Sequence, residues 1–118
     1  MNIDLTNEME TAGRAYAMLA EAVQAAAQAA EELAQAKFGL ERERASMIVA
    51  GLVEAKNEAT REAYLRERLS SMYTGLAMAE REARGTRYHV EMAQLEVDRV
   101  RLRVRLMELA AGQERQTA

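Results

Sequence analysis

The sequence contains no proline, no cysteine and no tryptophan, and it has a single histidine. Without cysteine it has no disulfide framework, no thiolate metal site and no cysteine nucleophile. Without proline, and with glycine at only 6 of 118 positions, it lacks the punctuation of an all-β sandwich rich in turns. These absences leave a helical protein of one domain as the expectation.

The residues that are present exclude two further classes. Apolar residues make up 49% of the chain and charged residues 30%, which is unlike a disordered tail or a membrane protein. The longest uncharged apolar run, residues 45–53, is far shorter than the roughly 20 residues that a membrane-spanning helix needs. The first residues lack the basic start and apolar core of a signal peptide. We therefore expect a cytoplasmic protein without a membrane partner.

The second half of the chain has the strongest pattern. Steps of four and three residues reach fourteen positions, of which thirteen are apolar and Thr86 is the exception. This spacing keeps one stripe on one face of a helix that pairs with another helix. The positions are Leu65, Leu69, Met72, Leu76, Ala79, Ala83, Thr86, Val90, Ala93, Val97, Val100, Val104, Met107 and Ala111.

The first half has the same rhythm. Its stripe runs through Leu5, Met9, Ala12, Tyr16, Leu19, Val23, Ala26, Ala30 and Leu33. The stripe then meets Lys37 and Arg44, and we expect it to shift to Phe38, Leu40, Met47, Ile48 and Leu52. Nearly half of residues 12–36 are alanine, the best helix former, whose small side chain also lets a partner helix approach closely.

The pattern stops between the halves, where Asn57 suits a helix N-cap. We predict an all-α fold: a helix at about 4–53, a turn at about 54–57, a helix at about 58–112 and a short disordered tail. Two such helices form a long antiparallel hairpin, similar to a coiled coil. Two alternatives stay open. Ser70-Ser71 or Thr74-Gly75 would divide the second helix and give three helices, and Gly85-Thr86 would bend it.

The C-terminal third carries a second apolar stripe, opposite the first. Its members are Tyr88, Met92, Leu95, Leu102, Leu106 and Leu109, with Arg99 filling the one gap. A helix with a single partner needs one stripe, so two stripes imply a second packed side. We predict a homodimer that forms a four-helix bundle. The alternatives are that the first helix covers both stripes, or that residues 1–10 fold back over the second.

Motifs of chemistry are absent from the sequence. His89 is the only histidine, and Thr86 stands where a diiron Glu-x-x-His motif needs glutamate. There is no glycine-rich phosphate loop, since the glycines are scattered. Acidic pairs such as Glu31-Glu32 suit a solvated helix face. We therefore predict a protein that is not an enzyme and holds no metal and no cofactor.

Arginine is concentrated in the second half, where residues 60–118 carry a net charge of +2 against −5 for residues 1–59. The cluster is Arg84, Arg87, Arg99, Arg101, Arg103 and Arg105. One interpretation is ion pairing between the helices, with the acidic first half. The other is contact with nucleic acid or a partner, since arginine is the preferred phosphate ligand. Interspersed acids and few aromatic side chains favour the first.

The apolar cluster at 45–53 lies near the predicted turn between the helices. The favoured interpretation is a local core with Tyr64, Leu65, Leu69 and Met72. In the alternative, Met47, Ile48 and Leu52 form a tip that contacts a partner, because methionine suits an adaptable surface.

Two stretches, KNEATREAYL at residues 56–65 and EMAQLEVDRVRL at 91–102, carry a resemblance to a known group. They resemble small helical proteins of tailed bacteriophages and prophages, which have a Lys-Asn-acidic turn and then a long helix with Leu, Val and Arg repeats. The likeness covers roughly residues 45–110. It implies a phage origin, a place in the host cytoplasm, and an accessory role in phage DNA metabolism or in blocking a host factor.

These observations predict a non-enzymatic interaction protein that self-associates and binds an unidentified protein partner, inhibiting or modulating a host or phage factor. One alternative is a DNA-binding accessory or nuclease inhibitor that uses the arginine-rich second helix. Another is a structural component of a virion or its assembly.

Overall fold

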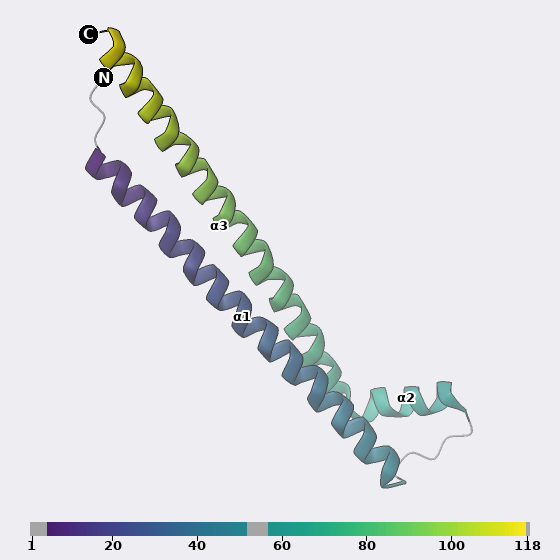
Figure 1. The fold of residues 1–118 in the computed structure, drawn as a ribbon. Coiled ribbons are helices and arrows are strands. Elements are labelled where there is room, and N and C mark those ends of the chain that lie inside the picture. Colours follow the sequence, from purple (N-terminus) through teal and green to yellow (C-terminus); the bar gives the residue numbers. More distant parts are fainter. Residues whose placement is uncertain (1–4, 52–56, 118) are drawn as a thin grey trace. The chain divides into compact units, whose positions relative to one another are not determined.

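The computed structural model describes residues 5–51 and 57–117, and within them the chain forms three helices and no strand. The helices are α1 (Leu5–Val49), α2 (Glu58–Arg68) and α3 (Ser70–Thr117), in the order that Figure 1 shows. The predicted all-α class is confirmed. No helix in these two ranges combines the length and the apolar character needed to cross a bilayer.

The contacts gather into two compact units rather than one. Unit 1 comprises residues 1–26 and 86–118, and unit 2 comprises residues 27–85. Unit 1 therefore contains the first part of α1 and the last part of α3. Unit 2 contains the rest of α1, all of α2 and the beginning of α3. In each unit α1 and α3 lie side by side in opposite directions, as the sequence predicts for a hairpin (Figure 1).

Unit 1 is held together by a narrow apolar seam. Ala15 of α1 is buried against Val97 and Val100 of α3, with Leu19 and Val104 partly buried beside them. All predicted stripe positions of α3, from Met72 to Ala111, are buried or half-buried, as are Leu65 and Leu69 before it. The predicted stripe of the second half therefore faces inward over its whole length.

The predicted stripe of α1 is only partly correct. Ala12, Leu19, Ala26 and Leu33 do face inward. Met9, Tyr16 and Val23, which should alternate with them in unit 1, are 75%, 45% and 51% exposed. Their places in the seam are taken by Glu8, Ala15 and Ala22. The helix is thus turned so that small alanines face α3, which allows the two backbones to approach closely.

Unit 2 has a larger core. Leu40 and Met47 of α1 are buried with Leu65 of α2 and with Leu69, and Tyr64, Met72, Tyr73 and Leu76 pack against them. The predicted shift of the stripe is wrong at Phe38, which is 65% exposed, and at Ile48, which is also exposed. The seam continues without a shift through Leu33, Ala36, Leu40 and Met47, all buried or half-buried. Leu52 lies outside the described residues.

Local hydrogen bonds explain where α1 ends and α2 begins. After α1, Gly51 adopts φ +69°, the left-handed conformation that glycine takes without strain, and its N–H donates to the Ile48 carbonyl at 3.1 Å. At the start of α2, the Asn57 side-chain oxygen accepts the N–H of Thr60 at 2.8 Å. The predicted N-cap is confirmed.

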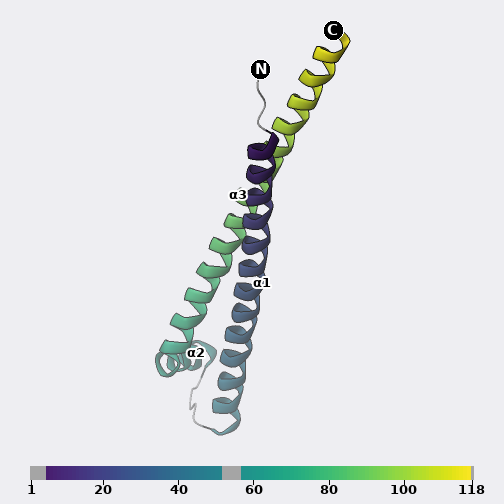
Figure 2. The same ribbon diagram turned by 90° about the vertical axis from the view of Figure 1, so that its left-hand side faces the viewer.

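The predicted second helix, 58–112, is wrong in two respects. It is divided at Leu69, whose φ of −109° and ψ of 26° are not helical. The Leu69 N–H still donates to Leu65, and its carbonyl accepts from Tyr73, so the break leaves both groups bonded. The break lies at Ser70-Ser71, one of the open alternatives, and there α2 turns away from the line of α3 (Figures 1 and 2).

The second difference is at the C-terminal end. The tail predicted to be disordered after about residue 112 is helical as far as Thr117. Gly112 is the only glycine there, and the chain has no proline to stop a helix. One glycine costs a helix about 1 kcal/mol relative to alanine. The residues around Gly112 are good helix formers (Ala, Gln, Glu and Arg), so the helix continues through it.

The same substitution at two exposed glycines of unit 2 should have opposite effects. Gly75 is inside α3 with open space where a Cβ would lie, so Gly75→Ala should raise the free energy of unfolding by about 0.5–1 kcal/mol. Gly51→Ala forces a side chain into the left-handed region and should lower it by about 1–2 kcal/mol. Urea unfolding followed by circular dichroism measures both. Equal effects of the two substitutions would contradict these helix ends.

Candidate functional site

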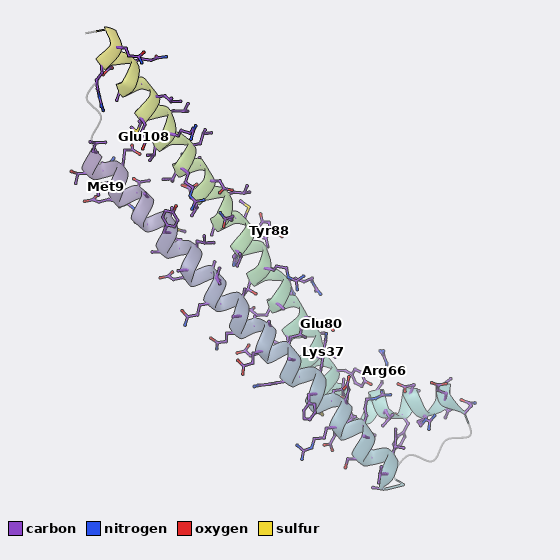
Figure 3. All side chains as sticks on the ribbon, viewed as in Figure 1. Met9, Lys37, Arg66, Glu80, Tyr88 and Glu108 are labelled. Carbon is purple, nitrogen blue, oxygen red and sulfur yellow. The ribbon has the colours of Figure 1, made fainter. Side chains whose placement is uncertain are left out.

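The second apolar stripe of the sequence forms one uncovered face of α3 in unit 1. All six predicted side chains on it are between 47% and 60% exposed. Tyr88, at the beginning of this face, is labelled in Figure 3. Steps of four and three residues place the stripe on the side of α3 opposite the buried seam. We call it the outer face: Tyr88, Met92, Leu95, Leu102, Leu106 and Leu109.

Both alternatives to an uncovered face are wrong for the described residues. α1 lies against the buried stripe of α3 and leaves the outer face exposed. Residues 5–10 do not fold back over it, because they are the first turns of α1. Single apolar residues scattered over a surface are normal, but six large apolar side chains in one stripe form a contiguous patch of the kind that marks an interaction site.

Arg99 fills the gap in the outer face and is held by a neighbour on its own helix. Its Nε and Nη2 donate to the two carboxylate oxygens of Glu96 at 3.0 and 2.6 Å. These hydrogen bonds lower the pKa of the Glu96 carboxyl below its usual range and raise the pKa of Arg99. The guanidinium is therefore paired beside the stripe and does not stand as a lone charge on it.

Two other arginines of the predicted cluster bridge to α1. Arg101 Nε donates to the Tyr16 hydroxyl at 2.7 Å, and its guanidinium lies 5.5 Å from the centre of the Tyr16 ring. Arg103 forms an ion pair with Glu8 at 2.9 Å. These contacts agree with the interpretation of the cluster as pairing between helices. The sequence pattern does not show either α1 partner, because it assigns Tyr16 to the buried stripe and gives Glu8 no inward position.

The remaining arginines of the cluster are all exposed. Arg84 belongs to unit 2, while Arg87 and Arg105 belong to unit 1. Within the ranges 5–51 and 57–116, neither Arg87 nor Arg105 forms an ion pair. The structure thus brings part of the cluster into the α1–α3 seam, and among the described residues Arg105 has no ion pair.

Glu8 occupies a seam position that is otherwise apolar. Only 8% of the residue is exposed, and among the described residues its Oε2 atom has no hydrogen-bond partner. Its other oxygen meets Arg103, whose side chain is itself more than half exposed. A buried oxygen without a partner costs stability, so Glu8 is the weakest point of the seam.

The predicted tip residues separate. Met47 is buried in the core of unit 2 with Leu65 and Leu69, and Tyr64 and Met72 pack against the same cluster. Ile48 is exposed next to Val49. Met47 and Ile48, the two predicted tip residues that the structure describes, therefore do not share one surface.

A polar network that the sequence does not announce crosses unit 2. Arg44 of α1 donates to both carboxylate oxygens of Glu62 on α2, one of them at 2.8 Å, and to the Tyr73 hydroxyl on α3. The arginine of this network was read in the sequence as an interruption of the stripe. Its hydrogen bond to Glu62 lowers the pKa of that carboxyl and raises the pKa of Arg44. The network joins all three helices.

No catalytic arrangement accompanies these features in the described residues. An open groove of about 520 Å³ in unit 1 is lined by small and apolar side chains, with Glu96 and the exposed His89 at its edge. Among residues 5–51 and 57–117, no three histidine, aspartate or glutamate side chains gather as a metal site would require. The feature that stands out in the described chain is the outer face.

Comparison of the chain with protein-family models, with curated proteins and with solved structures finds no match. The resemblance to small helical phage proteins therefore stays a prediction from the sequence.

The network of Arg44 gives unit 2 a dependence on pH. Because the pKa of Glu62 is lowered in the folded state, its stabilising contribution is present above the ordinary carboxyl pKa, about 4.3, and is lost as the pH falls through the lower folded value. Glu62→Gln should lower the urea midpoint at neutral pH and flatten its fall between about pH 5 and pH 3. Glu67→Gln on the same helix is the control. Parallel pH profiles of the Glu62→Gln variant and the unchanged chain would contradict this role.

The seam should become more stable when Glu8 is removed. Glu8→Leu restores an apolar side chain and leaves only the exposed Arg103 without its partner, so the free energy of unfolding should rise by about 1–2 kcal/mol. Glu10→Leu makes the same change at an exposed position of α1 and should stay within about 0.5 kcal/mol. Thermal unfolding measures the difference, and a destabilised Glu8→Leu variant would mean that the ion pair to Arg103 outweighs the unpaired oxygen.

Proposed function

We propose that the chain is a non-enzymatic interaction protein that self-associates through the outer face of α3. The observation that carries this proposal is the exposure of six large apolar side chains in one stripe, on a helix whose other stripe is already buried. A helix that is apolar on two sides is a helix with two packed neighbours. The second neighbour in the proposal is the same face of another copy.

The position of the face determines the kind of assembly. It lies opposite the seam with α1, so two copies of unit 1 would meet α3 against α3, with each α1 on the outside. The predicted four-helix bundle would then be a layer of helices with the two α3 helices at its centre. A two-fold pair that uses the same surface twice is the commonest form of homo-oligomer.

The arginine cluster supports this proposal better than nucleic-acid binding. Arg101 and Arg103 are engaged by Tyr16 and Glu8 of α1, and Arg99 is engaged by Glu96. Three of the six guanidinium groups thus already have acceptors, whereas a phosphate-binding surface presents unpaired cations. The resemblance of residues 56–65 and 91–102 to phage proteins adds the proposal that the assembled dimer binds and modulates a host or phage protein.

The dimer should depend on the centre of the outer face. Leu95→Arg with Leu102→Arg removes two half-exposed leucines from each copy, each worth about 1 kcal/mol on burial, and should weaken association on the order of a thousandfold. Arginine is a good helix former, so helicity should be retained. Light scattering coupled to size-exclusion chromatography gives the mass, and circular dichroism checks the fold.

A matched control changes two other exposed apolar residues of unit 1. Met9 and Val23 are 75% and 51% exposed on α1, and Met9→Arg with Val23→Arg adds the same charge away from the outer face. This variant should dimerise like the unchanged chain. A chain that is monomeric without any substitution at micromolar concentration would refute self-association.

A further inference from the structure

The orientation of the two α3 helices inferred here rests on the proposed self-association through the outer face. We infer that two copies pair antiparallel through the outer face, with the two-fold axis between Val100 and Arg101, so that Met92 lies opposite Leu109 of the second copy. Between these two residues the spacing of the face is symmetrical, and the charges beside one half are opposite to those beside the other.

The spacing of the face reads the same in both directions. From Met92 onward, with Arg99 in its gap, the face has six positions: Met92, Leu95, Arg99, Leu102, Leu106 and Leu109, separated by 3, 4, 3, 4 and 3 residues. A reversed copy therefore meets each of these six with a position of its own, and Tyr88 lies beyond them. In this register Met92 lies opposite Leu109, Leu95 opposite Leu106, and Arg99 opposite Leu102. The side chains then interdigitate along about 26 Å of helix.

The charges beside the face are divided between its two halves. Glu96 and Asp98 lie before the midpoint, and Arg103 and Arg105 lie after it. Asp98 and Arg105 are seven residues apart and so share one edge of the face, while Glu96 and Arg103 share the other. An antiparallel copy brings each acid to the base on its own edge, and the two-fold axis makes each pair twice. Charges at such flanking positions set the orientation of paired helices.

Other registers weaken this match. A shift toward the N-terminal end by one repeat brings Glu91 to Arg105 but puts Glu96 against Glu96 and Asp98 against Asp98 of the second copy. A shift toward the C-terminal end puts Arg103 and Arg105 against themselves. A parallel pair in register places Asp98 near Arg103 of the second copy but also Glu91 near Glu96, so attraction and repulsion cancel. Like charges held together at an interface oppose the wrong pairing.

Of the two kinds of pair, Asp98 with Arg105 should dominate. Both side chains are exposed; Asp98 accepts only the neutral Gln94 amide, at 3.0 Å, and Arg105 has no ion pair among the described residues. Glu96 and Arg103 already hold Arg99 and Glu8. Because Glu96 draws the Arg99 guanidinium to the edge, the aliphatic part of Arg99 is left to cover Leu102 of the second copy.

Disulfide trapping tests the orientation directly, because the chain has no cysteine of its own. Met92→Cys and Leu109→Cys variants with tags of different size are mixed and oxidised. The inferred register gives mainly the mixed 92–109 disulfide. Dominant 92–92 and 109–109 disulfides mean a parallel pair and overturn the inference, as does preferred trapping of Met92→Cys with Leu102→Cys, which marks the shifted register.

Light scattering on the reduced variants distinguishes a wrong register from a failure to self-associate. Dimers that give no 92–109 disulfide overturn the antiparallel register and leave the proposed self-association standing. Monomers overturn both. The cysteine substitutions are mild, and circular dichroism shows whether each variant keeps its helicity.

Charge reversal provides an independent test. Arg105→Asp turns two attractive pairs of the dimer into repulsive ones and should weaken dimerisation about tenfold. Asp98→Arg combined with Arg105→Asp restores opposite charges across the axis and should recover most of the loss. Arg87→Asp is the control, since Arg87 is exposed on α3 of unit 1 and lies before Met92, outside the paired stretch. A double variant as weak as Arg105→Asp alone would overturn the pairing of Asp98 with Arg105.

Discussion

The rest of the structure depends on one constraint, the limited apolar surface that a single pair of helices can cover. In unit 1, α3 presents the stripe of Val97 and Val100 to α1 and the stripe of Leu95 and Leu102 to solvent. α1 has only one side to offer, and it fills the seam largely with alanine. Its contact with α3 is therefore narrow, and it leaves the far side of α3 bare. This uncovered side is what the proposed second copy would pack against.

The rotation of α1 is the part of the fold that periodicity left undetermined. Two stripes with steps of four and three run along its N-terminal half, one through Met9, Tyr16 and Val23 and the other through Glu8, Ala15 and Ala22. Hydrophobicity favours the first and so predicts that Met9, Tyr16 and Val23 face inward. The structure buries the second, because small side chains let the backbones approach and because Arg101 and Arg103 reach across to Tyr16 and Glu8. Those partners are 85 and 95 residues distant in sequence, so no local pattern contains them.

Features that depend on one helix alone can be predicted from the sequence, whereas features that depend on the packing of three helices cannot. The stripe from Leu65 to Ala111 and the Asn57 cap follow from spacing and side-chain chemistry alone. The break at Leu69 cannot be predicted from the pattern of one helix, because it depends on the packing of unit 2. Folding α2 back buries Leu65 completely beside Leu40 and Met47. Arg44 interrupts the apolar stripe of α1 in the sequence, and only the packing of unit 2 explains its position. Its partners Glu62 and Tyr73 come from α2 and α3. The apparent break in the stripe is therefore the centre of a polar network that joins the three helices.

The arginine-rich part of α3 is better understood as two sets of charges with different directions. Arg101 and Arg103 contact Tyr16 and Glu8 of α1. Arg105 has no ion pair within residues 5–51 and 57–116, and it lies seven residues from Asp98, which has the opposite charge. An arginine cluster selected for phosphate would have no need of the acids between its members, because they lower the local potential. Acids before the midpoint of the outer face and bases after it are instead what a helix requires in order to recognise its own reversed copy, since the same sequence must supply both halves of every pair.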